Sequence, residues 1–161
     1  MRTSSYLKEF NVLNLEIRLA TIADCDVIVD YNCRLAEETE NKQLDRDAVT
    51  LGVSALLTDE RKGRYFVACH QGQIVGQLMH TFEWSDWRNG DLWWIQSVFV
   101  DPDFRRQGVY RRLYQHLVQL SESDANVAGI RLYVEVENHR AQQTYENLGM
   151  SKPGYLVMDN L

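Results

Sequence analysis

Two arginines and a glycine stand at one junction of the chain, in a spacing that suits an anion. The apolar run Leu92–Val100 ends at Asp101-Pro102, and Arg105, Arg106 and Gly108 follow at once, ahead of an amphipathic helical pattern. The first N–H groups of a helix lack intrahelical partners and carry partial positive charge, so a basic loop with a glycine suits a phosphate group there. The pattern predicts a strand, a tight turn, an anion-binding loop and a helix, with a pyrophosphate as the ligand.

Other residue types of catalytic chemistry lack comparable spacing. The sequence contains no HExxH, Walker or dinucleotide-binding pattern, so metal, nucleoside triphosphate and NAD chemistry have no support. The cysteines occupy apolar patterns and are predicted to be buried reduced thiols: Cys25, Cys33 and Cys69. The histidines have neither ligand spacing nor a catalytic partner and are predicted at the surface or in turns: His70, His80, His116 and His139.

Apolar periodicity predicts the elements that position the loop, beginning with one strand and two helices. Alternation over Leu15–Ala20 indicates the strand. Thr21 with Asp24 is typical of a helix start, and helical spacing follows it. A second helix is predicted over roughly Asp45–Leu57.

Three strands follow as a meander, which forces antiparallel pairing. Tyr65–Cys69 and Ile74–Thr81 are joined at Gly72 by a short hairpin connection. A second hairpin, Phe82–Asp91, leads into the long apolar run, and Asn89-Gly90 is expected to supply the positive φ of its turn.

The C-terminal part is predicted to contain two helices and two strands. A helix over Arg106–Ser123 precedes a strand that alternates between apolar and polar residues over Ile130–Glu137. Asn138 is expected to cap a short helix that Gly149 ends in a left-handed conformation, and Tyr155–Met158 reads as a terminal strand. The complete order is β-α-α-β-β-β-α-β-α-β, which describes an α+β domain.

Length and composition indicate one globular domain. The chain has 161 residues, of which 45% are hydrophobic and 25% charged. We expect residues 1–14 to form an N-terminal arm of uncertain structure and residues 15–161 to form the domain. The net charge of −6 disfavours nonspecific nucleic-acid binding, and the longest apolar run is far too short for a membrane span. Because the N-terminus has no continuous apolar segment of the kind found in secretory signals, we predict a cytoplasmic protein.

This element order and a short motif together carry a resemblance to a known family. Residues 105–110, RRQGVY, occupy the place of a Gln/Arg-x-x-Gly-x-Gly/Ala motif at the start of the central helix. Supporting features lie in register: Val98–Pro102, Val134–Asn138, Tyr145 and Leu148–Met150. With these features the sequence resembles the GNAT superfamily of acyl-CoA-dependent N-acyltransferases. The resemblance implies a GNAT fold with a central mixed, mostly antiparallel sheet that splays between its fourth and fifth strands.

The resemblance also implies acetyl-CoA as the cosubstrate and assigns residues to it. The pyrophosphate would lie on the motif residues Arg105, Arg106, Gln107, Gly108, Val109 and Tyr110. Val98–Val100, with Phe99 between the two valines, would pair with the pantetheine arm through backbone groups, and Val98 N–H would polarise the thioester carbonyl. Asn138 would reach the same arm, with a simple helix cap as the alternative. Tyr110 departs from the family pattern, which has Gly or Ala there, so its ring must point away from the loop or pack over the cofactor.

Catalysis would need an acid and a base. Tyr145 stands where the family has its general-acid tyrosine, and a core tyrosine is the alternative. Gln96 stands where some members carry a glutamate, and a glutamine can orient a water but cannot take a proton at neutral pH. Glu83 is the first candidate for a base, ahead of Glu37 or Glu38. A solvated acidic surface is the alternative for each of these carboxylates.

The same carboxylates outline an acceptor site for an amine, with Glu37, Glu38 and Trp84 as substrate-binding candidates. Opposite charge and aromatic faces both attract an ammonium group, at about 0.5–2 kcal/mol per cation–π contact. The tryptophans of the sequence can equally fill the core.

The resemblance thus predicts a metal-free enzyme that acetylates a small-molecule primary amine by direct attack in a ternary complex. The alternatives are a protein N-terminal or lysine acetyltransferase and a noncatalytic acyl-CoA-binding module. Family members often dimerise, although no feature of this sequence requires it.

Overall fold

The computed structural model describes residues 13–160, so nearly all of the predicted N-terminal arm lies outside the described residues. The chain forms two compact units, of which the first ends at Arg131 and the second begins at Leu132. That residues 15–161 act as one domain stays a prediction. Within residues 13–160, no helix combines the length and the apolar character needed to cross a bilayer.

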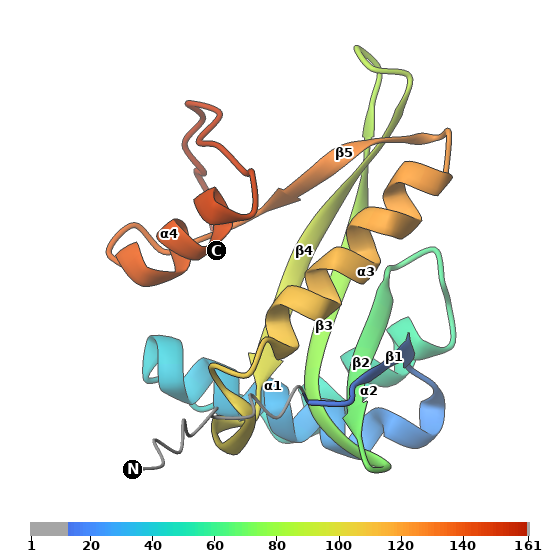
Figure 1. The fold of residues 1–161 in the computed structure, drawn as a ribbon, viewed down its shortest axis with the longest axis vertical. Helices are drawn as coiled ribbons and strands as arrows, with labels where there is room; N and C mark the ends of the chain where they lie inside the picture. Colours follow the sequence, from blue (N-terminus) through green and yellow to red (C-terminus); the bar gives the residue numbers. More distant parts are fainter. Residues whose placement is uncertain (1–12, 161) are drawn as a thin grey trace, which may run out of the picture. The chain divides into compact units, whose positions relative to one another are not determined.

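A mixed five-stranded sheet organises the first unit (Figure 1). Its strands lie in sequence order: β1 (Glu16–Leu19), β2 (Arg64–His70), β3 (Gln73–Ser85), β4 (Gly90–Val100) and β5 (Val127–Leu132). The pairs from β1 to β4 are antiparallel. β5 starts beside the start of β4, where Asp91 N–H donates to Asn126 O at 2.7 Å, and further along Arg131 lies over the Trp94 ring. Because these contacts advance in the same direction on both strands, β5 is parallel to β4, and the sheet is mixed and mostly antiparallel, as predicted.

Helices cover both faces of this sheet. α1 (Cys25–Glu40) and α2 (Arg46–Leu57) share a core with one face of β2 and β3, in which Val29 and Val53 pack with Val67. α3 (Val109–Ser123) covers the other face, where His116 contacts the ring of Phe66. Adjacent strand residues point to opposite faces, which explains how Phe66 and Val67 serve the two cores. The sequence alternation therefore sets up a three-layer arrangement.

The predicted start of α1 is confirmed. Thr21 and Asp24 form a reciprocal capping box around a 3₁₀ turn (η1, Ile22–Asp24) that leads into the helix. Arg18 on β1 holds the Asp24 carboxylate through two hydrogen bonds of 2.8 and 2.9 Å. These contacts lower the pKa of Asp24 to about 2, so the buried carboxylate is charged at neutral pH.

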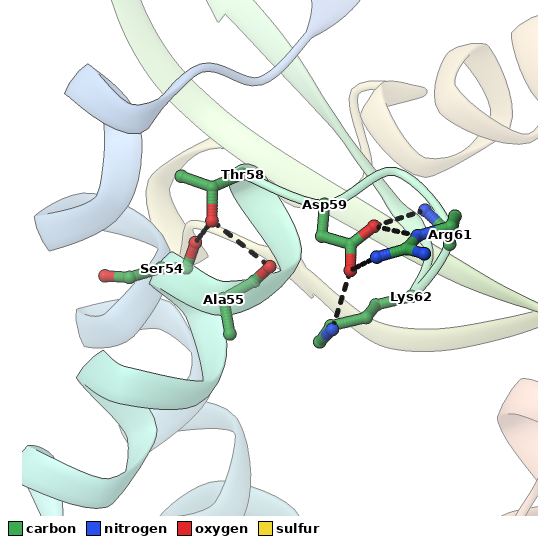
Figure 2. Close-up of polar contacts among 6 residues, drawn as sticks. All are labelled: Ser54, Ala55, Thr58, Asp59, Arg61 and Lys62. Carbon is green, nitrogen blue, oxygen red and sulfur yellow. Dashed lines mark hydrogen bonds and ion pairs between the residues drawn. The ribbon is translucent and has the colours of Figure 1, made fainter.

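The connection from α2 to β2 is held by local side chains (Figure 2). The Thr58 hydroxyl donates to Ser54 O at 2.8 Å, which closes the last turn of α2. Asp59 then accepts hydrogen bonds from Arg61 Nε and Lys62 Nζ, each at 2.8 Å. These contacts lower the pKa of Asp59 below its usual range and turn the chain towards β2.

The second hairpin is longer than predicted. β3 continues to Ser85 and β4 begins at Gly90, so only four residues form the turn. Asn89 takes the positive φ of 48°, whereas Gly90 is not in a left-handed conformation. The glycine is needed for another reason, because a Cβ at position 90 would lie 2.7 Å from the O atom of Asn126, which immediately precedes β5.

The start of α3 also differs from the prediction of a helix from Arg106. A 3₁₀ turn (η2, Pro102–Phe104) follows β4, and α3 begins only at Val109. Arg106 and Gly108 have φ values of 63° and 82°, which no right-handed helix contains. The basic residues therefore form a loop ahead of the helix.

The second unit contains less strand than the alternating pattern predicts. β5 ends at Leu132, and residues 133–138 are not a strand. Hydrogen bonds within the unit use their carbonyl groups, because Gln142 Nε2 donates to Val136 O at 2.7 Å and Asn138 N–H donates to Glu135 O at 3.0 Å. α4 (His139–Asn147) follows, with Asn138 as its N-cap and Gly149 at φ 90° after its end, both as predicted.

The predicted terminal strand Tyr155–Met158 is wrong for this structure, which assigns no strand to the segment. Its four side chains are 68–93% exposed. A β pattern forms a strand only where a neighbouring backbone supplies hydrogen bonds, and the described residues provide no such partner here.

Candidate functional site

A bulge interrupts β4 in the segment assigned to the pantetheine arm. Gln77 of β3 lies opposite Phe99, and Met79 lies opposite Gln96, so two steps on β3 match three on β4. Ser97 within this bulge has a φ of 48°. Serine rarely adopts this conformation, and for that reason nothing in the sequence marked the residue.

The backbone beyond the bulge presents polar groups away from β3. Asp101 donates its N–H to Val75 O at 3.0 Å. Hydrogen-bonded and non-hydrogen-bonded pairs alternate in an antiparallel ladder, so Val100, opposite Gly76, turns its N–H and C=O to the side facing β5. Arg105 Nε donates to Val100 O at 2.9 Å, which leaves the Val100 N–H for a ligand.

Val98 and Phe99 differ in burial and in the groups available to bind a cofactor. Val98 is half-buried within the bulge, whereas Phe99 is 3% exposed and packs against Tyr31 with ring centroids 4.7 Å apart. The side chain of Phe99 is therefore part of the core. Any contribution of Phe99 to cofactor binding has to come from its backbone.

The loop after β4 leads to the start of α3, where the first N–H groups of the helix have no intrahelical partner. Gly108 is the N-cap, and the first helical hydrogen bond runs from Arg112 N–H to Gly108 O at 3.0 Å. Among residues 13–160, no side chain caps this end, and its first turn contains no acid. Gln107 Nε2 donates to Asp103 O at 2.9 Å and closes the loop on itself. Basic residues at an uncapped helix start are the arrangement that a bound anion stabilises.

The two arginines of the loop have different surroundings. Arg105 Nη2 lies 2.6 Å from Glu38 Oε2 at the end of α1, and its guanidinium lies over the Phe99 ring. Arg105 thus ties the loop to α1 and β4, while Arg106 is exposed. Glu38, predicted to bind substrate, is engaged with the loop instead, and Glu37 is exposed on α1.

The ring of Tyr110 packs along α3. Its ring lies beside that of Tyr114, one turn further along α3, with centroids 6.1 Å apart. Val109 is buried against β3, where a Cβ on Gly76 would come within 2.8 Å of its Cγ1. Gly76 therefore lets the start of α3 approach the sheet, a role that the sequence analysis missed.

The candidates for activating the amine share one face of the sheet but are spread along it. Gln96 Nε2 donates to Thr81 Oγ1 at 2.9 Å. Glu83 accepts a short hydrogen bond from Trp94 Nε1 and lies 3.5 Å from Arg131. Since Gln96 faces Met79 in the register, Glu83 is four residues further along β3, about 13 Å away. Thr81 is the closer neighbour of Gln96.

The tryptophans do not gather into one cage. Trp84 is 61% exposed and follows Glu83 on a strand, so it points to the opposite face. Trp93 is buried and stacks on His80 at 4.4 Å, and Trp87 lies exposed in the turn. The prediction that all four histidines lie at the surface or in turns is wrong for His80, which is fully buried.

A pocket of about 410 Å³ opens beside the bulge, on the face covered by α1 and α2. Its walls come from both helices, their connection and β4: Asn32, Leu35, Ala36, Thr39, Glu40, Lys42, Leu44, Val49 and Ser97. Apolar side chains form much of the wall, with one acid and one base among them. The predicted substrate-binding residues Glu37, Glu38 and Trp84 are not part of this lining.

Two further candidates belong to the second unit. Asn138 Oδ1 accepts from Ala141 N–H at 3.0 Å, so the side chain caps α4. Tyr145 lies within α4, and burial raises the pKa of its hydroxyl, which keeps the proton in place at neutral pH. The assignment of Asn138 to the cofactor stays a prediction.

Comparison with known proteins agrees with this geometry. The sequence matches the Acetyltransferase (GNAT) family over residues 28–150. It is 27% identical over 143 residues to an N-alpha-acetyltransferase of Sulfolobus acidocaldarius, covering 83% of this chain and 78% of the relative. A 56-residue stretch is 39% identical to the [ribosomal protein bS18]-alanine N-acetyltransferase of Escherichia coli, covering 35% of this chain and 37% of that enzyme.

Solved structures extend the likeness to the whole fold. A structure described as a possible acetyltransferase from Clostridium difficile 630 is 48% identical, with a TM-score of 0.87 over 91% of this chain and 97% of its own. A predicted acetyltransferase of Clostridium acetobutylicum, solved with acetyl-CoA, shares the fold at 18% identity, with a TM-score of 0.76 over 91% of this chain and 96% of its own. The chain belongs to the GNAT acetyltransferase family.

Proposed function

We propose that the protein transfers an acetyl group from acetyl-CoA to the primary amine of a small molecule. The observation that carries the proposal is the bulge of β4, which lies between an uncapped helix start and a pocket of about 410 Å³. Backbone donors at the start of α3 suit the pyrophosphate, and the Val100 N–H suits the pantetheine arm. The pocket has the size of a small-molecule site.

The amine must lose a proton before it attacks. A primary amine has a pKa near 10.4, so making it neutral at pH 7 costs about 4–5 kcal/mol. Gln96, held by Thr81, is suited to orienting a water that accepts this proton. Glu83 is the carboxylate that we assign as the eventual base, reached through solvent.

The bond changes then need two further groups of the chain. The N–H of Val98 polarises the thioester carbonyl while the C–N bond forms and the C–S bond breaks. Tyr145 gives its proton to the departing thiolate, since its raised pKa keeps the hydroxyl protonated until the sulfur carries charge. The second proton of the attacking nitrogen leaves as the amide forms and, passed through solvent, restores the Tyr145 hydroxyl. The products are an acetamide and CoA, and no covalent enzyme intermediate is required.

A peptide α-amine is the second candidate acceptor. The observation that favours it is the likeness to relatives named as N-alpha-acetyltransferase and ribosomal-protein alanine N-acetyltransferase. Glu40 in the pocket wall would attract the N-terminal ammonium group of a peptide as readily as that of a small molecule.

An acetylation assay with matched acceptors tests the proposal. Purified protein is given acetyl-CoA with small primary amines, amino acids and short peptides, while CoA release and acetylated product are followed. We expect product from at least one small amine, and a strongly reduced kcat for Tyr145→Phe with unchanged acetyl-CoA affinity. Tyr133→Phe is the control, because Tyr133 has no assigned role.

Each other outcome changes the conclusion. Product from peptides alone would assign the second candidate. Acetyl-CoA binding without CoA release for every amine tested would contradict an enzymatic function and leave a binding module. Wild-type turnover by Tyr145→Phe would remove Tyr145 from the mechanism.

A further inference from the structure

A network of three polar side chains lies beneath the bulge, and Gln77 is the member that bonds to the backbone of Ser97. Gln77 Nε2 donates to Ser97 O at 3.2 Å and to Asn32 Oδ1 at 2.7 Å. Asn32 Nδ2 in turn donates to the Tyr65 hydroxyl at 2.9 Å, and the Ser97 side chain lies close enough to this hydroxyl to influence its pKa. Helix α1 and strands β2 and β3 therefore each contribute a side chain to the network around this residue of β4.

The burial of Gln77 in the core is energetically unfavourable. It is fully buried, and its Oε1 atom has no hydrogen-bond partner among the described residues. An unsatisfied buried polar atom costs roughly 1–3 kcal/mol, which an apolar side chain of similar size would avoid. A residue chosen only for packing would not be a glutamine.

The buried Gln77 stabilises an unfavourable backbone conformation at Ser97. A φ of 48° is unfavourable for serine, and such a residue persists only where its surroundings hold it in place. The bulge also takes Ser97 out of the regular ladder, so its carbonyl needs another donor. Gln77 supplies that donor from the neighbouring strand.

We propose that Gln77 is a positioning residue that fixes the bulge of β4 in the conformation that binds acetyl-CoA. The inference rests on the proposed function, because it concerns the backbone assigned to the pantetheine arm and the thioester. Asn32 orients the Gln77 amide. Since Asn32 and Ser97 both line the pocket, the network also joins the pocket wall to the bulge.

Calorimetric titration with acetyl-CoA tests this role in the full chain. Gln77→Met keeps the approximate volume and removes both donated hydrogen bonds, and we expect the Kd to rise at least tenfold. His80→Met is the matched control, because His80 is equally buried, three residues along β3, and points to the opposite face. We expect its Kd to stay within twofold of wild type even if its stability falls.

A second series separates positioning from a merely structural role. Ser97→Gly relieves the unfavourable φ, so Gln77→Met should weaken binding by less than threefold in that background. An equal loss in both backgrounds would show that Gln77 acts only through general stability and would overturn the proposal. If Gln77→Met does not fold, Tyr65→Phe carries the test, with an expected rise in Kd of at least threefold.

The outcomes also distinguish this inference from the proposed function. Wild-type protein that binds no acetyl-CoA overturns both. Wild-type binding with an unchanged Kd for the folded Gln77→Met variant, or for Tyr65→Phe in its place, overturns the positioning role alone.

Discussion

The burial and charge of a single residue in this protein can depend on its neighbours more than on its residue type, as His80 shows. His80 is fully buried between the rings of Phe66, Phe82 and Trp93. Burial lowers its pKa to about 4, and the positive charge of Arg64 acts in the same direction. The imidazole is thus a neutral aromatic part of the core at physiological pH.

Replacing His80 should change how stability depends on pH. In the unfolded chain this histidine binds a proton near pH 6.5, whereas in the folded chain it does so only near pH 4. The unfolded state therefore gains protons first, and the histidine lowers the free energy of unfolding as the pH falls from 6.5 to 4. The full effect is about 3 kcal/mol.

Urea unfolding of wild type and His80→Met at several pH values measures this effect. We expect the difference in unfolding free energy to shift in favour of the variant by about that amount between pH 7 and pH 4. A constant difference over this range would show that His80 is protonated alike in both states.

At the scale of the element, the start of α3 depends on a glycine that lies in another strand. Gly76 of β3 lets Val109 approach so closely that an added Cβ would come within 2.8 Å of Val109 Cγ1 and 3.2 Å of Phe99 O. Neither neighbour is the end of a long flexible side chain, so the helix start would have to move. The loop assigned to the pyrophosphate precedes this point directly.

Gly76→Ala should therefore weaken both stability and cofactor binding. Overpacking of this kind costs roughly 1–3 kcal/mol in unfolding free energy, and displacement of α3 should raise the Kd for acetyl-CoA several-fold. Gly52→Ala is the control, since a Cβ at position 52 in α2 meets nothing within 4 Å. It should stabilise by about 0.5–1 kcal/mol without changing the Kd. Unchanged binding by Gly76→Ala would show that the helix start does not shift.

The helices and strands were predictable wherever the residue types and the spacing of apolar residues indicate the same structure. Gly108 and the arginines before it mark a loop, and the apolar period of α3 marks its buried face, so the junction of strand, loop and helix follows from the sequence. Ser97 does not, because serine has no preference for positive φ and the bulge arises from strand pairing. Ile130–Glu137 alternates throughout, yet the strand ends at Leu132, because only tertiary contacts decide where a ladder continues.

The residues assigned to the pyrophosphate are neighbours in the sequence, whereas the residues around the pocket are not. The loop Arg105–Tyr110 is a local motif that a sequence displays directly. The pocket beside Ser97 combines residues from α1, α2, their connection and β4, and distant segments meet only in the fold. Side chains alternate between the two faces of a strand, so the adjacent residues Glu83 and Trp84 of β3 point to opposite faces.

At the scale of the molecule, the fold is a three-layer first unit followed by a second unit that contains α4. Binding of a ligand by the native state stabilises it by RT ln(1 + [L]/Kd), whichever residues make the contacts. A proposed cosubstrate can therefore be tested without knowing the acceptor.

Acetyl-CoA should raise the melting temperature of the whole protein. At 100 times its Kd the gain is about 2.7 kcal/mol, which corresponds to about 5–10 °C for a chain of this size. Pantetheine, which lacks the pyrophosphate, should give a much smaller shift in the same thermal denaturation measurement. Equal shifts for both ligands would contradict a pyrophosphate site at the start of α3.

The turn between β3 and β4 has an evolutionary consequence. Asn89 supplies the left-handed backbone, and Gly90 supplies the clearance for Asn126 O. Descendants of this chain can exchange Asn89 for glycine or aspartate and keep the turn, but any side chain at position 90 pushes β5 away. Reversing the dipeptide to Gly-Asn would preserve composition but place a side chain against Asn126 O, so the two neighbouring positions are expected to diverge at different rates.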